Sequence, residues 1–350
     1  MRLRSTLFAG LLALGLVAAA CGDDGGAGTT GATGASASGE TGPAVSGPAC
    51  CTELTIVTEW PYPDPLWIPF LAADDQGYYA DAGLDVTLQT PPNNSSTMKM
   101  LAGGDAQVGL SATTDVVFAR GEDLPVVSIS NMTQSNNWGL FQLGEQPIDV
   151  SALAGKTIGI YNDSWTAAML PLVLASGGLT MDDVKTVAAT ASVIPLLLHG
   201  RIDVATEVTN LGGVEITTSG GGAFTQLLGP EAGAPDTPVW VYVANSEWAS
   251  ANPDLTAAWL DATRRGIEWA SQNPDEAVAL FEQAYPEAAT DNGYNLEAWK
   301  ATIPLLSVSG AYPAQTDEEW SSFPQALVDA GQLDDALAPA EYYTNAYVGA

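Results

Sequence analysis

The segment LTIVTEWPYPDPLWIPFLAADDQGYYADAGLDVTLQ, Leu54–Gln89, contains the pattern from which the fold can be predicted. It opens on an apolar β-type run, LTIV, and closes on LDVTLQ, in which apolar and polar residues alternate as in a strand with one buried face. Between them, Trp67–Ala82 is predicted to form a helix that ends near Gly83. A strand, a helix and a second strand in this order predict a βαβ unit with parallel strands.

The same alternation continues to Ser130 and then begins again. AQVGLS, Ala106–Ser111, and PVVSIS, Pro125–Ser130, are further predicted strands. KTIGIY, Lys156–Tyr161, starts a second series, followed by a helix that Asp163 and Ser164 cap and by three short strands. We therefore predict an α/β fold with two lobes, each a mostly parallel sheet flanked by helices.

Two extended segments are expected to carry the chain between the lobes, as a pair of hinge strands. They are WGLFQL, Trp138–Leu143, and PVWVYVAN, Pro238–Asn245. The first lobe is predicted to hold residues 53–140 plus about 240–350, and the second lobe about 141–239. After Asn245 the chain is predicted to be helical, and we expect its tryptophans to serve in packing.

The amino-terminal residues have the pattern of an export signal. Residues 1–20 combine two arginines with an apolar run that is too short to span a bilayer. Ala18-Ala19-Ala20-Cys21 resembles a bacterial lipobox, in which Cys21 would be lipidated; the alternative is an ordinary secretory peptide cleaved near Ala20. Residues 21–52, rich in Gly, Ala, Ser and Thr, are predicted to be a flexible tether. Cys50 and Cys51 are expected to be structural or incidental.

The charge of the chain limits its partners. The formal net charge is −31, with only ten Lys and Arg residues. This excess of acid opposes binding to nucleic acid and to an anionic membrane surface. We therefore expect no nucleic-acid partner, and membrane attachment only through the lipid at Cys21.

Catalytic and cofactor motifs are not apparent. The only histidine, His199, stands beside Gly200 at an apparent helix end, where it is expected to be a C-terminal cap residue. The sequence has no G-x-S-x-G elbow, phosphate loop, zinc-ligand spacing or EF-hand loop. We predict a protein that is not an enzyme and has no cofactor and no metal.

Residues at the carboxyl ends of the predicted strands are the candidates for a binding site, because ligands of open α/β sheets lie there. They combine aromatic, hydroxyl, amide and carboxylate groups, and the segments that carry them contain no Lys or Arg. The predicted ligand-binding residues are Glu59, Trp60, Tyr62, Asp64, Ser111, Thr113, Asn137, Trp138, Asn162, Ser164, Trp165 and Glu207.

This set of groups favours a flat, nitrogen-rich heterocycle. Such a ring can stack on Trp60 or Trp165. The Glu207 carboxylate can accept two N–H bonds from an amino-heterocycle. A sulfonate or phosphate would prefer a nearby Lys or Arg, although a helix amino terminus can hold an anion. For the aromatic residues, packing between the lobes is the alternative. As cleft residues, Trp60 and Glu207 are expected to be exposed.

At these residues the chain resembles a known family. It is similar to substrate-binding proteins of ABC importers in the thiamine-pyrimidine-precursor group, also called NMT1/THI5-like, with sulfonate, nitrate and taurine binders as relatives. The resemblance rests on pieces such as EWPYPDP, MKMLAGGDAQVGLS, DVSALAGKTIGIYNDS and LLLHGRIDVAT, which occur in the same order. It implies a type II periplasmic-binding-protein-like fold and a lipid-anchored receptor on the extracytoplasmic face. That receptor would deliver an aminopyrimidine-like heterocycle to an ABC permease.

The chain also departs from that group. Glu59-Trp60-Pro61 fits the segment after the first strand, whereas Tyr62-Pro63-Asp64-Pro65 does not. The pyrimidine-synthesising enzymes of the group carry a CCCFC motif, which is absent here. The alternatives are a receptor for alkanesulfonate, nitrate, taurine, riboflavin or a nucleobase, or a pyrimidine-synthesising enzyme of the same fold.

Overall fold

The computed structural model describes residues 51–349 except 190, 307–309 and 311. The predictions for the signal segment, Cys21, most of the tether and Cys50 lie outside the described residues. The described strands are β1 (Thr52–Val57), β2 (Leu84–Gln89), β3 (Val108–Ala112), β4 (Val126–Asn131), β5 (Trp138–Leu143), β6 (Thr157–Tyr161), β7 (Lys185–Ala189), β8 (Val204–Val208), β9 (Phe224–Leu228) and β10 (Trp240–Asn245).

Helices occupy most of the connections between these strands. The described α-helices are α1 (Ile68–Asp75), α2 (Tyr78–Asp81), α3 (Thr97–Gly103), α4 (Thr113–Gly121), α5 (Ser164–Ser176), α6 (Ile194–Leu198), α7 (Val214–Thr218), α8 (Ser246–Ala251), α9 (Pro253–Gln272), α10 (Pro274–Ala284), α11 (Tyr294–Thr302) and α12 (Glu319–Asp329). Shorter helical turns are η1 (Pro65–Trp67), η2 (Val150–Leu153), η3 (Met181–Asp183), η4 (Thr209–Gly213), η5 (Pro230–Ala232), η6 (Pro286–Ala288), η7 (Ile303–Leu305) and η8 (Pro339–Glu341).

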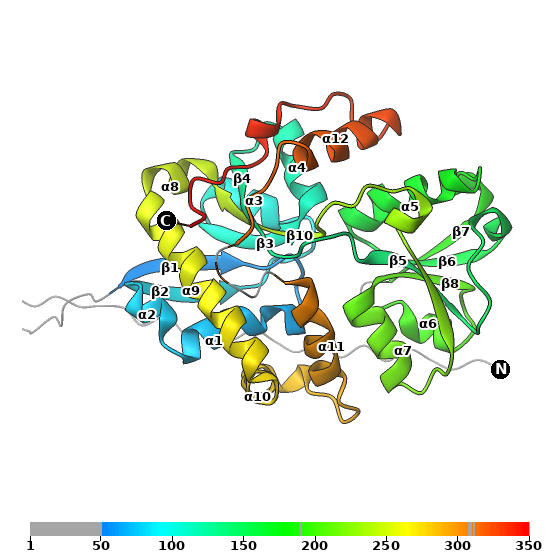
Figure 1. The fold of residues 1–350 in the computed structure, drawn as a ribbon, viewed down its shortest axis with the longest axis horizontal. Coiled ribbons are helices and arrows are strands. Elements are labelled where there is room, and N and C mark those ends of the chain that lie inside the picture. Colours follow the sequence, from blue (N-terminus) through cyan, green and yellow to red (C-terminus); the bar gives the residue numbers. More distant parts are fainter. Residues whose placement is uncertain (1–50, 190, 307–309, 311, 350) are drawn as a thin grey trace, which may run out of the picture. The chain divides into compact units, whose positions relative to one another are not determined.

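The strands form two sheets, and each sheet with its helices makes one lobe (Figure 1). The first sheet has the order β2-β1-β3-β10-β4 and the second the order β7-β6-β8-β5-β9. In the first sheet, β10 runs antiparallel to both of its neighbours, and β5 does the same in the second. The predicted α/β fold of two mostly parallel sheets is therefore confirmed, and the strand that crosses from the other lobe runs opposite to the rest.

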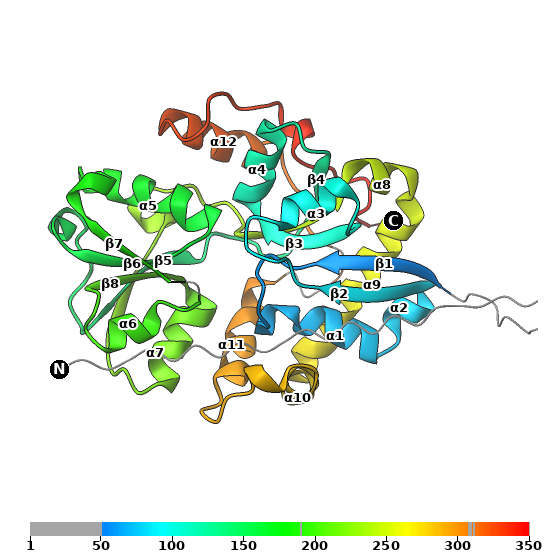
Figure 2. The same ribbon diagram turned by 180° about the vertical axis from the view of Figure 1, so that it is seen from behind.

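Helices cover both faces of each sheet. In the first lobe, α1, α9 and α10 lie on one side of the sheet and α3 and α4 on the other, an arrangement that is visible from both directions (Figures 1 and 2). In the second lobe, α5 lies on one side and α6 and α7 on the other. Consecutive crossovers that move along a sheet in opposite directions place their helices on opposite faces when each crossover is right-handed.

The helix predicted over Trp67–Ala82 is wrong in its continuity. The chain forms η1, then α1, then α2, and Gly77 separates the last two with φ of 72°. This left-handed conformation is accessible to glycine at little cost, and it cannot continue an α-helix. The break turns the chain back toward β2.

The first lobe is held together by aromatic packing under the sheet. Trp259 of α9 is fully buried and its ring lies 5.4 Å from Tyr242 of β10 and 6.5 Å from Phe70 of α1. On α9, Gly266 permits close contact with α1, because a Cβ there would lie 2.3 Å from Pro69 O. Removing the Trp259 side chain would cost roughly 3–5 kcal/mol of stability. The packing role predicted for the tryptophans after Asn245 is confirmed at Trp259.

Candidate functional site

The site begins where strands of the two sheets end. The segment after β1 turns into η1, and Asp64 caps this turn because its Oδ1 accepts a hydrogen bond from Leu66 N at 2.8 Å. The segment after β6 turns into α5, where Asp163 Oδ1 accepts from Thr166 N at 2.6 Å, as predicted for a cap residue. Both caps direct carboxyl groups toward the carboxyl ends of the strands.

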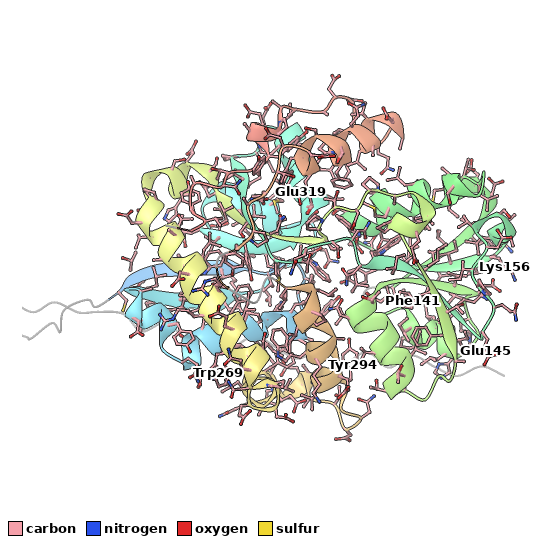
Figure 3. The ribbon with its side chains drawn as sticks, in the orientation of Figure 1. Phe141, Glu145, Lys156, Trp269, Tyr294 and Glu319 are labelled. Atoms are coloured by element: carbon pink, nitrogen blue, oxygen red, sulfur yellow. The ribbon has the colours of Figure 1, made fainter. Side chains whose placement is uncertain are left out.

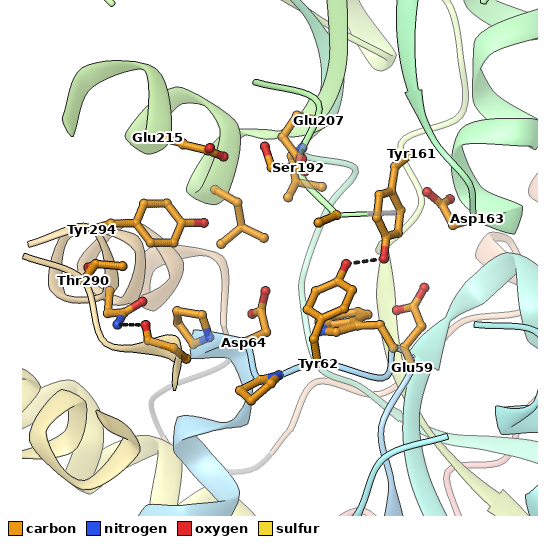
Figure 4. A pocket seen from close by; sticks show the side chains of 18 of the residues that line it. Glu59, Tyr62, Asp64, Tyr161, Asp163, Ser192, Glu207, Glu215, Thr290 and Tyr294 are labelled. Carbon is orange, nitrogen blue, oxygen red and sulfur yellow. Dashed lines mark hydrogen bonds between the residues drawn. The ribbon is translucent and has the colours of Figure 1, made fainter. Parts of the chain in front are cut away.

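A cavity of about 450 Å³ lies among these segments (Figure 4). Residues of the first lobe line it from Glu59 to Pro65, together with Val239 and Trp240. Residues of the second lobe line it from the ends of β6 and β8 and from η4 and α7. The volume suits a small organic molecule, since pockets for such ligands begin at about 300 Å³.

Two tyrosines connect the lobes across this cavity. The Tyr62 hydroxyl, from the segment after β1, forms a hydrogen bond with the Tyr161 hydroxyl at the end of β6 (Figure 4). Asn94 Nδ2 also donates to the Tyr161 hydroxyl at 3.2 Å and to Asn162 O at 3.3 Å. A molecule in the cavity would therefore lie next to contacts that hold the lobes together.

Glu59 occupies one side of the cavity as a buried acid. Its side chain is 6% exposed, and its Oε2 accepts a hydrogen bond from Trp240 Nε1 at 2.9 Å. Burial, with Asp115 and Asp163 nearby, raises the pKa of this carboxyl well above its usual range. No described basic side chain lines the cavity to offset that cost.

The pKa values of four other carboxyl groups of the cavity are shifted in the same direction. Burial raises the pKa of Glu207 to about 8 and the pKa values of Asp64 and Asp163 each to about 7. Burial also raises the pKa of Glu215. A cavity with so many acids and no described Lys, Arg or His among its lining residues favours a ligand that donates hydrogen bonds or carries positive charge.

Aromatic rings supply the apolar part of the lining. Trp60 lies with its ring 6.2 Å from Trp240 and 6.5 Å from Tyr62. Trp165 packs at 5.6 Å on Phe323. The indole N–H groups of Trp60 and Trp165 are buried and have no hydrogen-bond partner, which costs about 1–3 kcal/mol for each buried donor. A ligand with an acceptor atom would lower this cost if it reached them.

The structure brings most of the predicted site residues together. Those that line the cavity are Glu59, Trp60, Tyr62, Asp64, Trp138, Trp165 and Glu207. Asn162 and Ser164 line a neighbouring cavity of about 570 Å³, which Glu59 and Asp163 also border. Their participation in ligand binding stays a prediction.

Three predicted residues line neither cavity, and their donor groups bond inside the protein, while Asn137 Oδ1 is buried without a partner among the described residues. Ser111 donates to Asp115 Oδ2 at 2.6 Å, and Thr113 donates to Pro238 O at 2.6 Å. Asn137 Nδ2 donates to Asn210 Oδ1 at 2.8 Å. All three are buried. Ser111 lies near the end of β3, Thr113 directly follows β3, and Asn137 directly precedes β5.

The expected exposure of two cleft residues was also wrong. Trp60 is 6% exposed, since it packs against Trp240 and Tyr62, and Glu207 is half-buried. Complete truncation of Trp60 would therefore remove core packing, at roughly 3–5 kcal/mol, as well as a ligand contact.

Sequence reasoning missed several lining residues. Tyr161 is the last residue of β6, and its aromatic hydroxyl at a strand end was a usable signal. Glu215, in α7, had no comparable signal. The segment before α11 had no such signal either. It reaches the cavity because α11, which packs on α10 and η1, also contacts α7 and η4. Figure 3 shows Tyr294 on α11, on the side toward α7. The missed residues include Tyr161, Ser192, Glu215, Thr290, Tyr294 and Asn295.

Some other features bear on the predicted chemistry. His199 is the C-cap of α6, as predicted, and its Nδ1 lies 2.7 Å from Pro195 O. Within residues 51–349, apart from the gaps given above, no group of three or more His, Cys, Asp or Glu side chains could hold a metal ion. In the same residues, no helix combines the length and apolar character needed to cross a membrane.

Comparisons with known proteins agree with the resemblance seen in the sequence. The family model described as NMT1/THI5 like matches residues 64–277. A formylaminopyrimidine-binding protein from Halalkalibacterium halodurans is 26% identical over 269 residues, which cover 76% of this chain and 81% of the relative.

Two further relatives represent other activities. A 4-amino-5-hydroxymethyl-2-methylpyrimidine phosphate synthase from Candida albicans is 25% identical over 250 residues, covering 68% of this chain and 73% of the relative. The periplasmic aliphatic sulphonate binding protein SsuA from Escherichia coli superposes with a TM-score of 0.66 at 12% identity, over 83% of this chain and 92% of that one. At that identity, the superposition shows a common fold.

Proposed function

Since this chain belongs to the NMT1/THI5-like family, we propose that it is a solute-binding protein that captures a small amino-substituted nitrogen heterocycle between its two lobes. The observation that carries the proposal is the lining of the cavity, in which six carboxyl groups stand among Trp and Tyr rings with no described basic side chain. The formylaminopyrimidine-binding relative supports a pyrimidine as the heterocycle.

The site residues would divide the work between stacking and hydrogen bonding. Trp60, Tyr62 and Trp165 would contact the faces and edges of the ring, and Glu207 or Asp64 would accept its N–H groups. The prolines beside Tyr62 limit the conformational freedom of that wall before binding, so less entropy is lost when the ligand arrives.

We propose a receptor and not an enzyme, although several relatives are named as synthases. The CCCFC motif of those synthases is absent from the sequence, and His199 serves as a helix cap and is not among the residues that line the cavity. Release of a modified pyrimidine from purified protein would overturn this assignment.

The receptor would act outside the cytoplasm. We propose that residues 1–20 direct export, that Cys21 is lipidated and anchors the chain, and that residues 21–52 tether it to the folded part. We further propose that residues 53–140 with about 240–350 move as one lobe, and about 141–239 as the other. An ABC permease would accept the solute from the closed protein.

Ligand charge tests the proposed function. An anion beside these carboxylates would face repulsion of about 4 kcal/mol for one like-charge contact at 4 Å and an effective dielectric constant near 20. We expect 4-aminopyrimidines to raise the melting temperature of the purified protein, and taurine, nitrate and sulfate to leave it unchanged. A panel in which only the anions stabilise the protein would replace this proposal with a sulfonate or nitrate receptor.

A further inference from the structure

Five acidic side chains of the cavity, all except the exposed Glu287, form two groups on either side of the Tyr62–Tyr161 pair in Figure 4. The Asp64 group consists of Asp64, Glu207 and Glu215. The Asp163 group consists of Glu59 and Asp163. A single aminopyrimidine edge, once its ring nitrogen is protonated, can satisfy one carboxylate with a pair of parallel N–H bonds. One such ring therefore leaves most of these acids without a ligand donor.

The two groups differ in how many of their carboxyl oxygens accept hydrogen bonds from the protein itself. In the Asp163 group, both Asp163 oxygens accept from Thr166, at 2.6 Å from N and 2.9 Å from Oγ1, and Glu59 accepts from Trp240. In the Asp64 group, Asp64 uses Oδ1 for Leu66 N, and Glu207 uses Oε1 for Val208 N at 2.9 Å. Among the described residues, none donates to Asp64 Oδ2 or Glu207 Oε2.

The cavity also contains buried hydrogen-bond donors that have no acceptor. The indole N–H groups of Trp60 and Trp165, residues that are 6% and 3% exposed, have no acceptor, and both residues line the cavity. Buried donors of this kind call for an acceptor atom such as a ring nitrogen. The cavity thus lacks an acceptor for its buried tryptophan N–H groups, and no described residue donates to Asp64 Oδ2 or Glu207 Oε2, although the Ser192 hydroxyl is bonded to Glu215.

We propose that the ligand carries, besides its heterocycle, a protonated alkylamine that lies between Asp64 of the first lobe and Glu207 and Glu215 of the second. This inference rests on the proposed function, and it narrows the ligand class to cationic aminoalkyl heterocycles. An ammonium group has three N–H donors, which matches the number of carboxyl groups that surround the position.

Because these three carboxyl groups come from both lobes, the charge of the ligand is expected to affect how readily the lobes close. Asp64 follows β1, whereas Glu207 lies near the end of β8 and Glu215 lies in α7, so closing the lobes brings together acids that repel one another once they are ionised. An ammonium group between them converts that repulsion into attraction from both sides. A neutral ligand of the same shape would leave the repulsion in place.

Two isosteric probes test the inference. They are a 2-methyl-4-aminopyrimidine with a hydroxymethyl group at position 5 and its counterpart with an aminomethyl group, which has the same number of heavy atoms and one positive charge. We expect calorimetry at pH 7 and low salt to give at least tenfold tighter binding of the aminomethyl probe. Equal binding, or tighter binding of the hydroxymethyl probe, overturns the inference.

Variants locate the charge preference. Asp64→Asn keeps an oxygen that can cap η1, and Glu207→Gln keeps the shape of the side chain, so both variants are expected to fold, which thermal melting would check. We expect each to reduce the preference for the aminomethyl probe at least fivefold, with less effect on the hydroxymethyl probe. Glu145→Gln removes the same charge from an exposed turn of the second lobe and should leave the preference unchanged (Figure 3). An undiminished preference in both cavity variants also overturns the inference.

The failure of the proposed function would give a different result. If neither pyrimidine binds, the heterocycle assignment fails, and benzylamine against benzyl alcohol then tests the charge preference alone. Tighter binding of benzylamine in the wild type, lost in Glu207→Gln, supports a cationic ligand of another class. The absence of any difference between these two probes overturns the inference as well.

Discussion

Tyr62 and Tyr161 form a hydrogen bond between their hydroxyl groups, although 99 positions separate them in the chain and they belong to different lobes. Tyr62 follows β1 of the first lobe, and Tyr161 is the last residue of β6 in the second. Thr114 and Ser164 form a second hydroxyl pair between the lobes at 2.6 Å. These contacts describe a conformation in which the lobes are together.

Removing the tyrosine hydroxyls is expected to weaken closure. A single intramolecular hydrogen bond contributes about 1 kcal/mol, or about a fivefold change in an equilibrium. Tyr62→Phe should therefore weaken binding of the aminomethylpyrimidine about fivefold. Tyr161→Phe should weaken it more, since Tyr161 also accepts from Asn94. Solution scattering should show a smaller fall in radius of gyration on ligand addition than in the wild type.

A double variant and a surface tyrosine provide the controls. Because the two hydroxyls bond to each other, Tyr62→Phe with Tyr161→Phe should bind no more weakly than Tyr161→Phe alone. Tyr343→Phe removes a hydroxyl that bonds to Asp317 at 2.8 Å, away from the cavity, and should change neither binding nor scattering. Strictly additive losses in the double variant would argue against a direct contact between the hydroxyls in solution.

Several residues that line the cavity could be predicted from the sequence, and their part in binding stays a prediction. The alternation of strands and helices predicted two sheets, and the rule that ligands lie at the carboxyl ends of parallel strands located Glu59, Asp64, Trp165 and Glu207 beside one cavity. Asp163 was also recognisable as a helix cap, because an acidic residue precedes the helix directly. These features depend on residues close together in the chain.

The remaining features depend on contacts that no local pattern encodes. Ser111 lies near the end of β3 and Thr113 directly after it, much as Glu207 lies near the end of β8, but Asp115 and Pro238 accept the hydrogen bonds of their hydroxyl groups. Tyr294 reaches the cavity because α11 packs on the second lobe, and its position in the sequence gives no indication of this. The burial of Trp60 likewise follows from its packing against Trp240.

The two neighbouring tryptophans of the cavity are expected to differ in their contribution to stability. Trp60 and Trp240 are similarly buried, at 6% and 5%, but only Trp240 donates an N–H bond, to Glu59. Replacement by Phe removes similar volume from each. Trp240→Phe should therefore lower the free energy of unfolding by about 1 kcal/mol more than Trp60→Phe in ligand-free protein. Urea unfolding measures the difference, and an equal loss in the two variants would contradict it.

The same two variants distinguish the roles of these residues in binding. If a ligand acceptor reaches the Trp60 N–H, Trp60→Phe should weaken ligand binding about three- to tenfold, while its effect on ligand-free stability stays the smaller of the two. Phe323→Leu, which alters packing against Trp165 without changing a donor, serves as a comparison for volume.

Lipid attachment is expected to depend on Cys21. Cys21→Ser in the full chain removes the thiol that would carry the lipid, while leaving the small residues before it unchanged. We expect the wild type to sediment with membranes and to enter the detergent phase on Triton X-114 partition, and the variant to be released or to remain unprocessed. Cys51→Ser is the matched control and should stay with the membrane. A wild-type protein found wholly in the aqueous phase would contradict the lipoprotein proposal.

The stability of the ligand-free protein is expected to fall as pH rises from 5 to 8. The pKa values of Asp64, Asp163 and Glu207 are raised by burial to about 7, 7 and 8, whereas in an unfolded chain such groups titrate near 4. The folded protein therefore holds more protons than the unfolded chain in this window, so raising the pH favours unfolding, and the effect levels off above about pH 8. Melting temperatures across the range should fall for the wild type by several degrees.

Glu207→Gln should reduce this dependence of melting temperature on pH, since one group then no longer titrates, whereas Glu145→Gln should retain it. A melting temperature that is constant or rises between pH 5 and 8 would contradict the assignment of these acids to a buried, uncompensated cavity.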